Sequence, residues 1–142
     1  MKLSNKSLYA LEALRHLARN YGGKPLSAAR LAADCDFSSK YLEQVLAALK
    51  NKGIVVSERG KHGGYVLRLP PEKITLGDIV RAIDGPLAPI GCASRTAPSY
   101  NRCKHCRPDT CWIRKVMLRV RDNVSAIMDR ETLAKMLKEE SR

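Results

Sequence analysis

The sequence contains no apolar run that approaches the roughly 20 residues needed to span a membrane. Residues 1–6 have a basic start, but no apolar signal core or cleavage site follows them, so we expect a cytoplasmic protein with no membrane partner. The 3 histidines lie in no base–nucleophile pattern, and the chain has neither a phosphate-binding glycine loop nor a carboxylate pair. An enzyme is therefore the least expected class.

Acidic residues are scarce relative to basic ones. The chain has 14 Asp and Glu against 26 Lys and Arg, which gives a formal charge of +12. A small protein with this excess usually binds a polyanion, and nucleic acid is the first candidate. Residues 1–85 carry 14 basic and 8 acidic side chains, and residues 86–142 carry 12 and 6, so the excess is +6 in each part. The positive charge is thus spread along the chain.

The N-terminal third predicts three helices. Leucines recur at helical spacing over residues 8–17, and Gly22-Gly23 ends that first helix. Ser27 is a suitable N-cap for a second helix over residues 28–35. A third helix is expected over residues 39–52, with an apolar face formed by Leu42, Val45, Leu46 and Leu49. Two helices joined by a short turn indicate a helix-turn-helix.

The segment after the third helix predicts a β-hairpin. Residues 54–57 and 65–69 have β-like composition and flank a glycine-rich turn at residues 60–64. A hairpin that follows a helix-turn-helix forms a wing. Thr75 then caps a short helix, with Asp78 at the third position as in a capping box.

The C-terminal part predicts a loop and a long helix. Residues 86–108 contain most of the cysteines and form a loop that is long for a compact domain, which is typical of functional loops. The long amphipathic helix that follows is interpreted as a dimerisation helix, with Trp112 as a packing anchor at its start. Its apolar stripe consists of Ile113, Val116, Met117, Val120, Val124, Ile127 and Met128.

The expected fold class is mainly α with a small β-wing, namely a winged helix-turn-helix plus a long C-terminal dimerisation helix. We expect three regions. Residues 1–85 form the winged helix-turn-helix DNA-binding domain, and residues 86–110 form a cysteine-rich sensor loop. Residues 111–142 form the dimerisation helix and a short charged C-terminal helix.

The candidate DNA contacts lie on the third helix and the wing. In a helix-turn-helix the first turns of the second helix reach base edges in the major groove, and here these positions hold Ser38, Ser39, Lys40, Glu43 and Gln44. Gln pairs with adenine, Glu accepts from cytosine and Lys reaches guanine or phosphate, while Tyr41 can donate to a phosphate. We expect Arg59 to enter a minor groove and Lys61 to contact phosphate. The alternative is that all are ordinary solvent-facing polar residues.

Four of the 5 cysteines lie close together in the sequence, namely Cys92, Cys103, Cys106 and Cys111. The gaps of two and four residues among the last three are typical of ligands for a soft metal or an iron–sulfur cluster. Cys111 lies near the start of the long helix, where the helix dipole stabilises a thiolate.

Three interpretations of these cysteines remain open. The first is an iron–sulfur cluster with two or four irons. The second is a zinc site made of Cys103, Cys111 and either His105 or Cys106. The third is a metal-free thiol switch. Cys35 is expected to be a small core residue without a role, and His16 is not expected to be a ligand.

Several strings of residues, each weak alone, become specific through their order and spacing. They are Leu3-Ser4, Tyr9-Ala10-Leu11, Tyr41-Leu42-Glu43-Gln44, Arg59-Gly60, Gly63-Gly64-Tyr65, Ile74-Thr75, Gly77-Asp78 and Gly85-Pro86-Leu87-Ala88-Pro89. Over about residues 1–137 the chain resembles winged-helix regulators of the IscR/NsrR/CymR type. That family includes iron–sulfur sensors and a cysteine-metabolism regulator, and some members have no cluster.

The resemblance implies a homodimer with crossed long helices and two wings on palindromic double-stranded operator DNA. In cluster-binding members, three cysteines and one non-cysteine ligand hold the cluster. Cys92 matches the first cysteine and Cys111 the third, and the second is Cys106 or, alternatively, Cys103.

The chain departs from the family at the fourth ligand. Arg114 stands three residues after the last cysteine, where the iron–sulfur biogenesis regulator has a histidine, and Arg cannot ligate. Leu8 stands where nitric-oxide-sensing members have a carboxylate from the partner's first helix, and Glu12, one turn later, could replace it. The competing class is an iron–sulfur protein whose winged helix mediates protein contacts.

Overall fold

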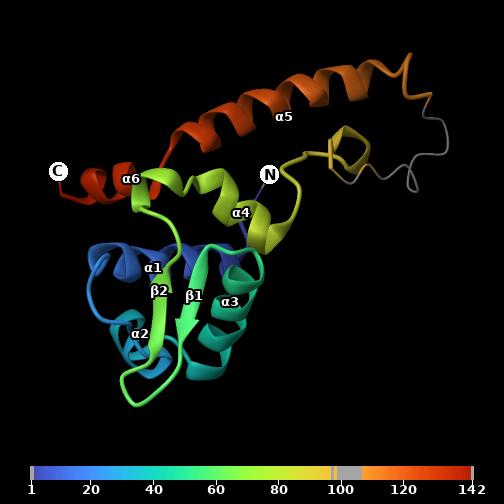
Figure 1. Ribbon diagram of the computed structural model, residues 1–142. Coiled ribbons are helices and arrows are strands. Elements are labelled where there is room, and N and C mark those ends of the chain that lie inside the picture. Colours follow the sequence, from blue (N-terminus) through green and yellow to red (C-terminus); the bar gives the residue numbers. More distant parts are fainter. Residues whose placement is uncertain (1, 97, 99–106, 142) are drawn as a thin grey trace.

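The computed structural model describes residues 2–96, 98 and 107–141, and it contains helices around one small sheet (Figure 1). The elements are α1 (Asn5–Arg19), α2 (Ala28–Cys35), α3 (Ser39–Asn51), β1 (Val55–Glu58), β2 (Gly64–Leu67), η1 (Pro71–Lys73), α4 (Leu76–Asp84), η2 (Gly91–Ala93), α5 (Trp112–Arg130) and α6 (Leu133–Glu140). The prediction of a mainly α fold with a small β-wing is confirmed. None of the described helices is both long and apolar enough to cross a membrane.

The core is formed where α1, α3 and α4 meet. The largest fully buried side chains there are Leu14, Leu42, Leu46, Leu49 and Ile79. Each side chain of this size contributes about 1.5–3 kcal/mol when it is fully buried. The leucines of α3 are those that formed the apolar face expected from the sequence, so the opposite face of this helix remains exposed.

Side-chain caps fix where the helices begin. The hydroxyl of Ser27 accepts the backbone N–H of Arg30, as predicted, and Thr75 and Asp78 form the predicted capping box. The first helix ends at Arg19, before the predicted Gly22-Gly23 signal, and Gly22 follows with a φ of 81°. Glycine adopts a positive φ at little cost, so Gly22 turns the chain after the helix has already ended.

Asp84, the last residue of α4, holds the N-terminus of α1. Its carboxylate accepts hydrogen bonds from the Ser4 backbone N–H at 3.1 Å, from the Ser4 hydroxyl, and from the Ser7 hydroxyl at 2.8 Å. Partial burial alone would raise the pKa of Asp84, but the hydrogen bonds from Ser4 and Ser7 and the charge of Lys6 hold it below its ordinary value. A carboxylate at a helix N-terminus also interacts favourably with the helix dipole.

The wing is an antiparallel pair in which Val55 faces Leu67 and Glu58 faces Gly64. An isolated bridge between Leu26 and Tyr65 ties the hairpin to the α1–α2 connection. The strands begin and end within two residues of the predicted bounds. Gly64 is required here, because a Cβ at this position would lie 2.4 Å from the backbone oxygen of Leu26.

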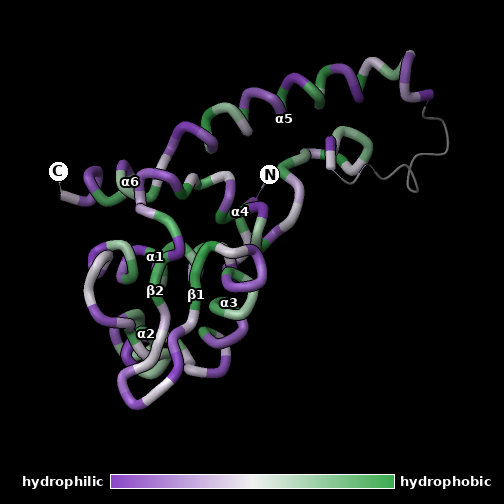
Figure 2. Tube along the Cα trace, viewed as in Figure 1, coloured by the Kyte–Doolittle hydropathy of each residue, from purple (hydrophilic) through white to green (hydrophobic). Residues whose placement is uncertain are grey.

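Apolar and hydrophilic residues alternate along the 19 residues of α5 (Figure 2), and the predicted apolar stripe is packed along one edge and exposed along the other. Met128 packs with Val80, Leu87 and Val124 against the rest of the chain. A second line, formed by Ile113, Val120 and Ile127, is exposed. The prediction that Trp112 is a packing anchor is wrong within the single chain, because 73% of this residue is exposed. It lies in the first turn of α5, away from the core.

Replacing Asp84 with Ala is expected to lower the free energy of unfolding by about 1–2 kcal/mol near neutral pH, because Ser4 and Ser7 lose a charged acceptor. Since the pKa of Asp84 is lowered in the folded state, its contribution is present above the ordinary Asp pKa of about 3.9 and disappears as the pH falls through the lower folded-state value. Urea unfolding at several pH values should therefore show a difference that shrinks in acid. The exposed Glu72→Ala is the control, and an Asp84→Ala effect independent of pH would contradict the assignment.

Candidate DNA interface and cysteine site

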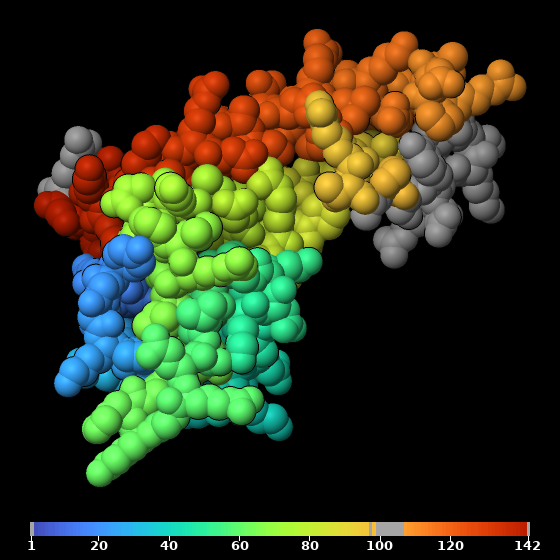
Figure 3. Space-filling model, viewed as in Figure 1, coloured from blue at the N-terminus to red at the C-terminus, as the bar shows by residue number. Residues whose placement is uncertain are grey.

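The start of α3 and the turn of the wing lie at the same end of the molecule, which is opposite to α5 (Figure 1, Figure 3). The exposed polar residues that were candidates for DNA contact gather there: Ser38, Ser39, Lys40, Glu43, Gln44, Arg59 and Lys61. We call this surface the reading end. The Lys50 ammonium donates to the Ser57 hydroxyl at 2.6 Å and thereby links α3 to β1. No local pattern in the sequence signals this contact between α3 and the wing.

Ser38 and Tyr41 have structural partners besides any DNA contact. The Ser38 hydroxyl oxygen caps α3 by accepting the Tyr41 backbone N–H at 3.3 Å. The half-buried Tyr41 ring meets Tyr9 edge to face, with a centroid distance of 5.0 Å, and Tyr9 meets Phe37 in the same way at 4.1 Å. These aromatic contacts fix the start of α3 against α1.

Two of the four clustered cysteines lie in the described residues. Cys92 is buried in η2, and Cys111 is the N-cap residue of α5, as its position near the helix start led us to expect. The Cys111 sulfur accepts the Arg114 backbone N–H at 3.5 Å. Cys103 and Cys106 lie outside the described residues, so the choice between them as the second ligand stays a prediction.

Arg114 joins the segments that carry the two described cysteines. Its Nε donates to the backbone oxygen of Cys92 at 3.0 Å, and its Nη1 donates to the backbone oxygen of Pro108 at 3.3 Å. Arg114 cannot ligate a metal, but it holds Cys92 beside the helix that Cys111 begins.

Arg121, two turns later on the same face of α5, holds the other side of η2. Only 6% of this residue is exposed. Its Nη1 donates to the backbone oxygen of Ala93 at 2.6 Å, and its Nε donates to Asp122 at 2.9 Å. The hydrogen bond from Arg121, and then the charge of Arg95, lower the pKa of Asp122. From the sequence, Arg114 was expected only as a residue that cannot ligate, and Arg121 was not singled out, although their spacing of seven residues places them on one helix face.

Glu12 lies on α1, apart from η2 and the start of α5 (Figure 1). Its partners in the chain are Arg15 and His16. The hydrogen bond from Arg15 is the largest cause of the lowered pKa of Glu12. Glu12 therefore stays a candidate cluster ligand only for a second chain.

Cys35 lies near Glu12 and His16, and it is half-buried at the end of α2. Burial, and then the charges of Glu12 and Asp34, raise the pKa of the Cys35 thiol to about 11. Cys35 was expected to be a small core residue and His16 was not expected to be a ligand, and nothing in the sequence indicated that the three side chains meet. The spacing of Glu12 and His16 by four residues was the available signal.

The chain is similar to known proteins over almost its whole length. The profile of the Rrf2 family, described as "Iron-dependent Transcriptional regulator", matches residues 3–139. The HTH-type transcriptional regulator CymR of Bacillus subtilis is 36% identical over 133 residues, which cover 94% of this chain and 87% of that protein.

Two solved structures have a similar fold. CymR (YrzC), described as the global cysteine regulator of B. subtilis, superposes with a TM-score of 0.77 at 34% identity and covers 98% of both chains. IscR of T. potens superposes with a TM-score of 0.75 at 31% identity and covers 99% of this chain and 88% of the other.

Replacing Arg121 with Met is expected to loosen η2, because the charged hydrogen bond to Ala93 contributes about 1.5–3 kcal/mol. A loss of that size raises the population of locally open states by roughly tenfold or more. Cys92 should then be alkylated faster by iodoacetamide, as measured by mass spectrometry of its peptide. Arg119→Met, on the exposed face of α5, is the matched control. Equal Cys92 alkylation in both variants would show that Arg121 does not hold this turn.

Proposed function

We propose that this chain, which belongs to the Rrf2 family of transcriptional regulators, binds operator DNA as a homodimer. We propose further that its DNA binding responds to an iron–sulfur cluster held by the loop cysteines. The relatives are named as transcriptional regulators, so the chain is a DNA-binding regulator and not an enzyme. The signal and the oligomeric state are proposals that go beyond this family assignment.

The observation that carries the DNA-binding proposal is the geometry of the reading end. Gln44 and Glu43 are exposed on α3, and Arg59 and Lys61 are exposed on the wing turn. An α-helix fits the major groove, where Gln and Glu can distinguish adenine and cytosine. An Arg on a glycine-rich turn suits a narrow minor groove. The Lys50–Ser57 hydrogen bond supports a fixed spacing between the two contacts.

The exposed line on α5 supports a homodimer. Ile113, Val120 and Ile127 follow one another at intervals of seven residues, which is the repeat of a helix that packs along another helix. Ile127 is 64% exposed, and Trp112 extends the apolar surface at the start of the helix. Apolar residues arranged in this way are typical of a protein–protein interface.

The residues around Cys92 and Cys111 fit an iron–sulfur cluster. The Cys111 sulfur lies at the N-terminus of α5, where the helix dipole stabilises a thiolate, and Arg107, Arg114 and Lys115 offer positive charge nearby in the chain. Cys92, Cys111 and Cys106, or Cys103 in its place, would supply three thiolates. The spare cysteine, His105 or Glu12 of a partner chain would supply the fourth ligand. When bound, such a cluster supplies a site that is sensitive to redox state and nitric oxide.

A connection from the cysteines to the reading end runs through α5 and α4. Arg114 and Arg121 hold η2 to the first half of α5. Near the other end, Arg81 on α4 makes a two-point ion pair with Asp129, at 2.7 and 2.9 Å. A change at η2 is therefore expected to shift α5 against α4, which alters the spacing of the two reading ends in a dimer.

A cluster-free thiol switch is the second candidate. It is favoured by the similarity to CymR, which is described as a cysteine regulator. A zinc site in the loop is a third arrangement of the same cysteines.

The test of the cluster proposal begins with protein purified without oxygen. Visible absorbance together with iron and sulfide analysis should show matched iron and sulfide. Operator DNA, selected from random duplexes, should bind with an affinity that changes when the cluster is lost. In Cys92→Ala, Cys106→Ala and Cys111→Ala this dependence should disappear. A colourless protein without iron, or an affinity unaffected by these variants under every redox condition, would reject cluster sensing.

Replacing Arg59 with Ala is expected to weaken operator binding by about 1–3 kcal/mol, and Lys61→Ala should reduce the salt dependence of the binding constant by about one ion. Fluorescence anisotropy at several salt concentrations measures both effects. Lys138→Ala on α6 removes the same charge far from the reading end and serves as the control. Unchanged DNA affinity in a folded Arg59→Ala protein would favour a role of the wing in protein contacts.

Replacing Val120 with Asp is expected to dissociate the dimer, because dimerisation would then bury a carboxylate in the interface formed by the exposed line on α5. Sedimentation equilibrium should show a monomer, with helix content retained because Val120 is outside the core. Arg119→Asp introduces the same carboxylate at the neighbouring exposed position. The proposed interface is wrong if the Val120→Asp chain sediments as the unaltered protein does.

A further inference from the structure

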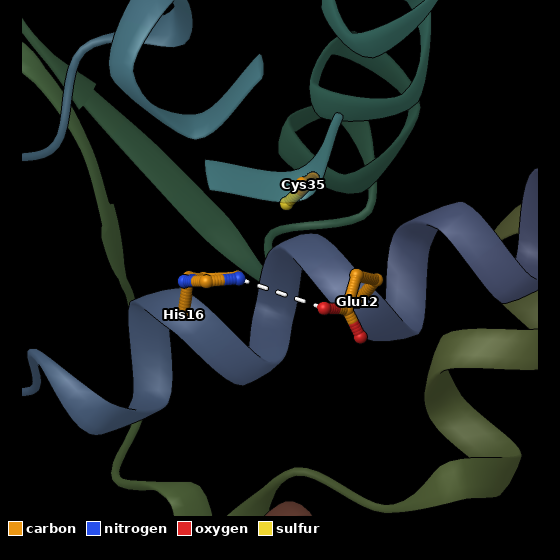
Figure 4. A group of neighbouring side chains, drawn as sticks. All are labelled: Glu12, His16 and Cys35. Atoms are coloured by element: carbon orange, nitrogen blue, oxygen red, sulfur yellow. Dashed lines mark ion pairs between the residues drawn. The ribbon is translucent and has the colours of Figure 1, made fainter. Parts of the chain in front are cut away.

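Glu12, His16 and Cys35 form a cluster of ligand-type side chains within one chain, apart from the cysteines of the proposed sensor (Figure 4). Glu12 and His16 are one turn apart on α1, and Cys35 is the last residue of α2. One donor atom from each residue lies within 4.8 Å of the other two. The Glu12 carboxylate and the His16 Nε2 are 3.5 Å apart, and only 18% of the His16 side chain is exposed.

We propose that Glu12, His16 and Cys35 bind one divalent cation of borderline softness, zinc or ferrous iron, with a water molecule as the remaining ligand. A thiolate, an imidazole and a carboxylate are the three ligand types that zinc takes in proteins, and imidazole also suits iron. Metal–ligand distances of about 2.0–2.3 Å place the donors of a tetrahedral site roughly 3.3–3.8 Å apart. Side-chain rotation can close the present spacing to that value. On binding, the thiol proton of Cys35 passes to solvent.

Helical geometry supports a site at this place. Residues four apart on a helix lie on the same face, so α1 presents Glu12 and His16 together without strain. Figure 4 shows Cys35 on α2 above that face of α1. The ligands thus come from two helices, and a bound cation would join the helices where they meet.

Arg15 occupies the same donors in the cation-free arrangement. Its Nε donates to the two Glu12 oxygens at 3.1 and 3.0 Å, and its Nη2 lies 3.3 Å from His16 Nε2. Its Nη1 also donates to Glu140 at 2.6 Å. A cation must therefore displace the guanidinium from Glu12, and Glu140 keeps Arg15 paired after the exchange. Arg15 competes with the cation for Glu12. Replacing Arg15 should therefore raise the cation affinity, whereas replacing any of the three ligands should lower it.

The position of the site connects it to the recognition helix. Cys35 is followed by Asp36, which has a φ of 55°, and by Phe37, whose ring packs on Tyr9. Ser38 then caps α3. A cation that fixes Cys35 to α1 would hold the turn from which α3 begins, independently of the loop cysteines.

The experiment uses the full chain with Cys92, Cys103, Cys106 and Cys111 replaced by Ser, so that Cys35 is the one remaining thiol. Cobalt(II) is the probe, because a thiolate ligand gives it a charge-transfer band and a tetrahedral site gives it visible bands. We expect one cobalt per chain and a rise in melting temperature. The charge-transfer band should vanish in Cys35→Ser. The affinity should fall about tenfold or more in Glu12→Gln and His16→Gln.

Arg15→Gln should bind cobalt several-fold more tightly, whereas Arg30→Gln, which removes the same charge from α2, should leave the affinity unchanged. Competition by zinc and by ferrous iron without oxygen then distinguishes the two cations. A missing cobalt band, or a band that persists unchanged in both Glu12→Gln and His16→Gln, overturns the proposal.

If the four-serine chain does not fold, the unaltered chain provides the same decision. Bound zinc should then protect Cys35 from alkylation by iodoacetamide, as measured by mass spectrometry of the Cys35 peptide. Absence of protection would refute the site. Because these readouts concern Cys35, their failure leaves the proposed loop-cysteine sensor intact.

Discussion

The buried guanidinium of Arg121 fixes how η2 lies against α5. A charged group this deeply buried is tolerated only when its donors are satisfied, and here Ala93 and Asp122 accept from it. The short turn that carries Cys92 is consequently held to a long helix by side chain–backbone bonds. Arg114 repeats the arrangement next to Cys111. The turn that carries Cys92 is thus attached to α5, and α5 is attached to α4 through Arg81 and Asp129.

The apolar stripe of α5 is only partly covered by the described residues. Val124 and Met128 pack on α4 and Leu87 within the chain, while Val120 and Ile127 remain exposed. An apolar stripe on a helix is stabilised when a partner covers its whole width. The described residues of the single chain cover one edge, and this is the physical basis for proposing that a second copy covers the other.

Local features of the fold could be predicted from sequence, and long-range ones could not. The caps at Ser27 and Thr75 depend on residues three positions apart, so the sequence contains the information. The expectation for Trp112 failed because periodicity shows that a residue is apolar and does not show what covers it. The role of Arg121 depends on a turn 28 residues earlier in the chain. The approach of Cys35 to His16 likewise depends on how α2 packs on α1, which no local pattern reports.

The Cys111 sulfur is both a candidate ligand and the N-cap of α5. A helix N-terminus has backbone donors without intrahelical partners, and a cap satisfies one of them. If chemistry at the sulfur removes its ability to accept the Arg114 N–H, that donor must turn to water, and the first turn of α5 frays. The chemical state of one thiol is then translated into the length of the helix. Trp112 and Ile113, the first two residues of α5, would be held in place when the turn is formed and released when it frays.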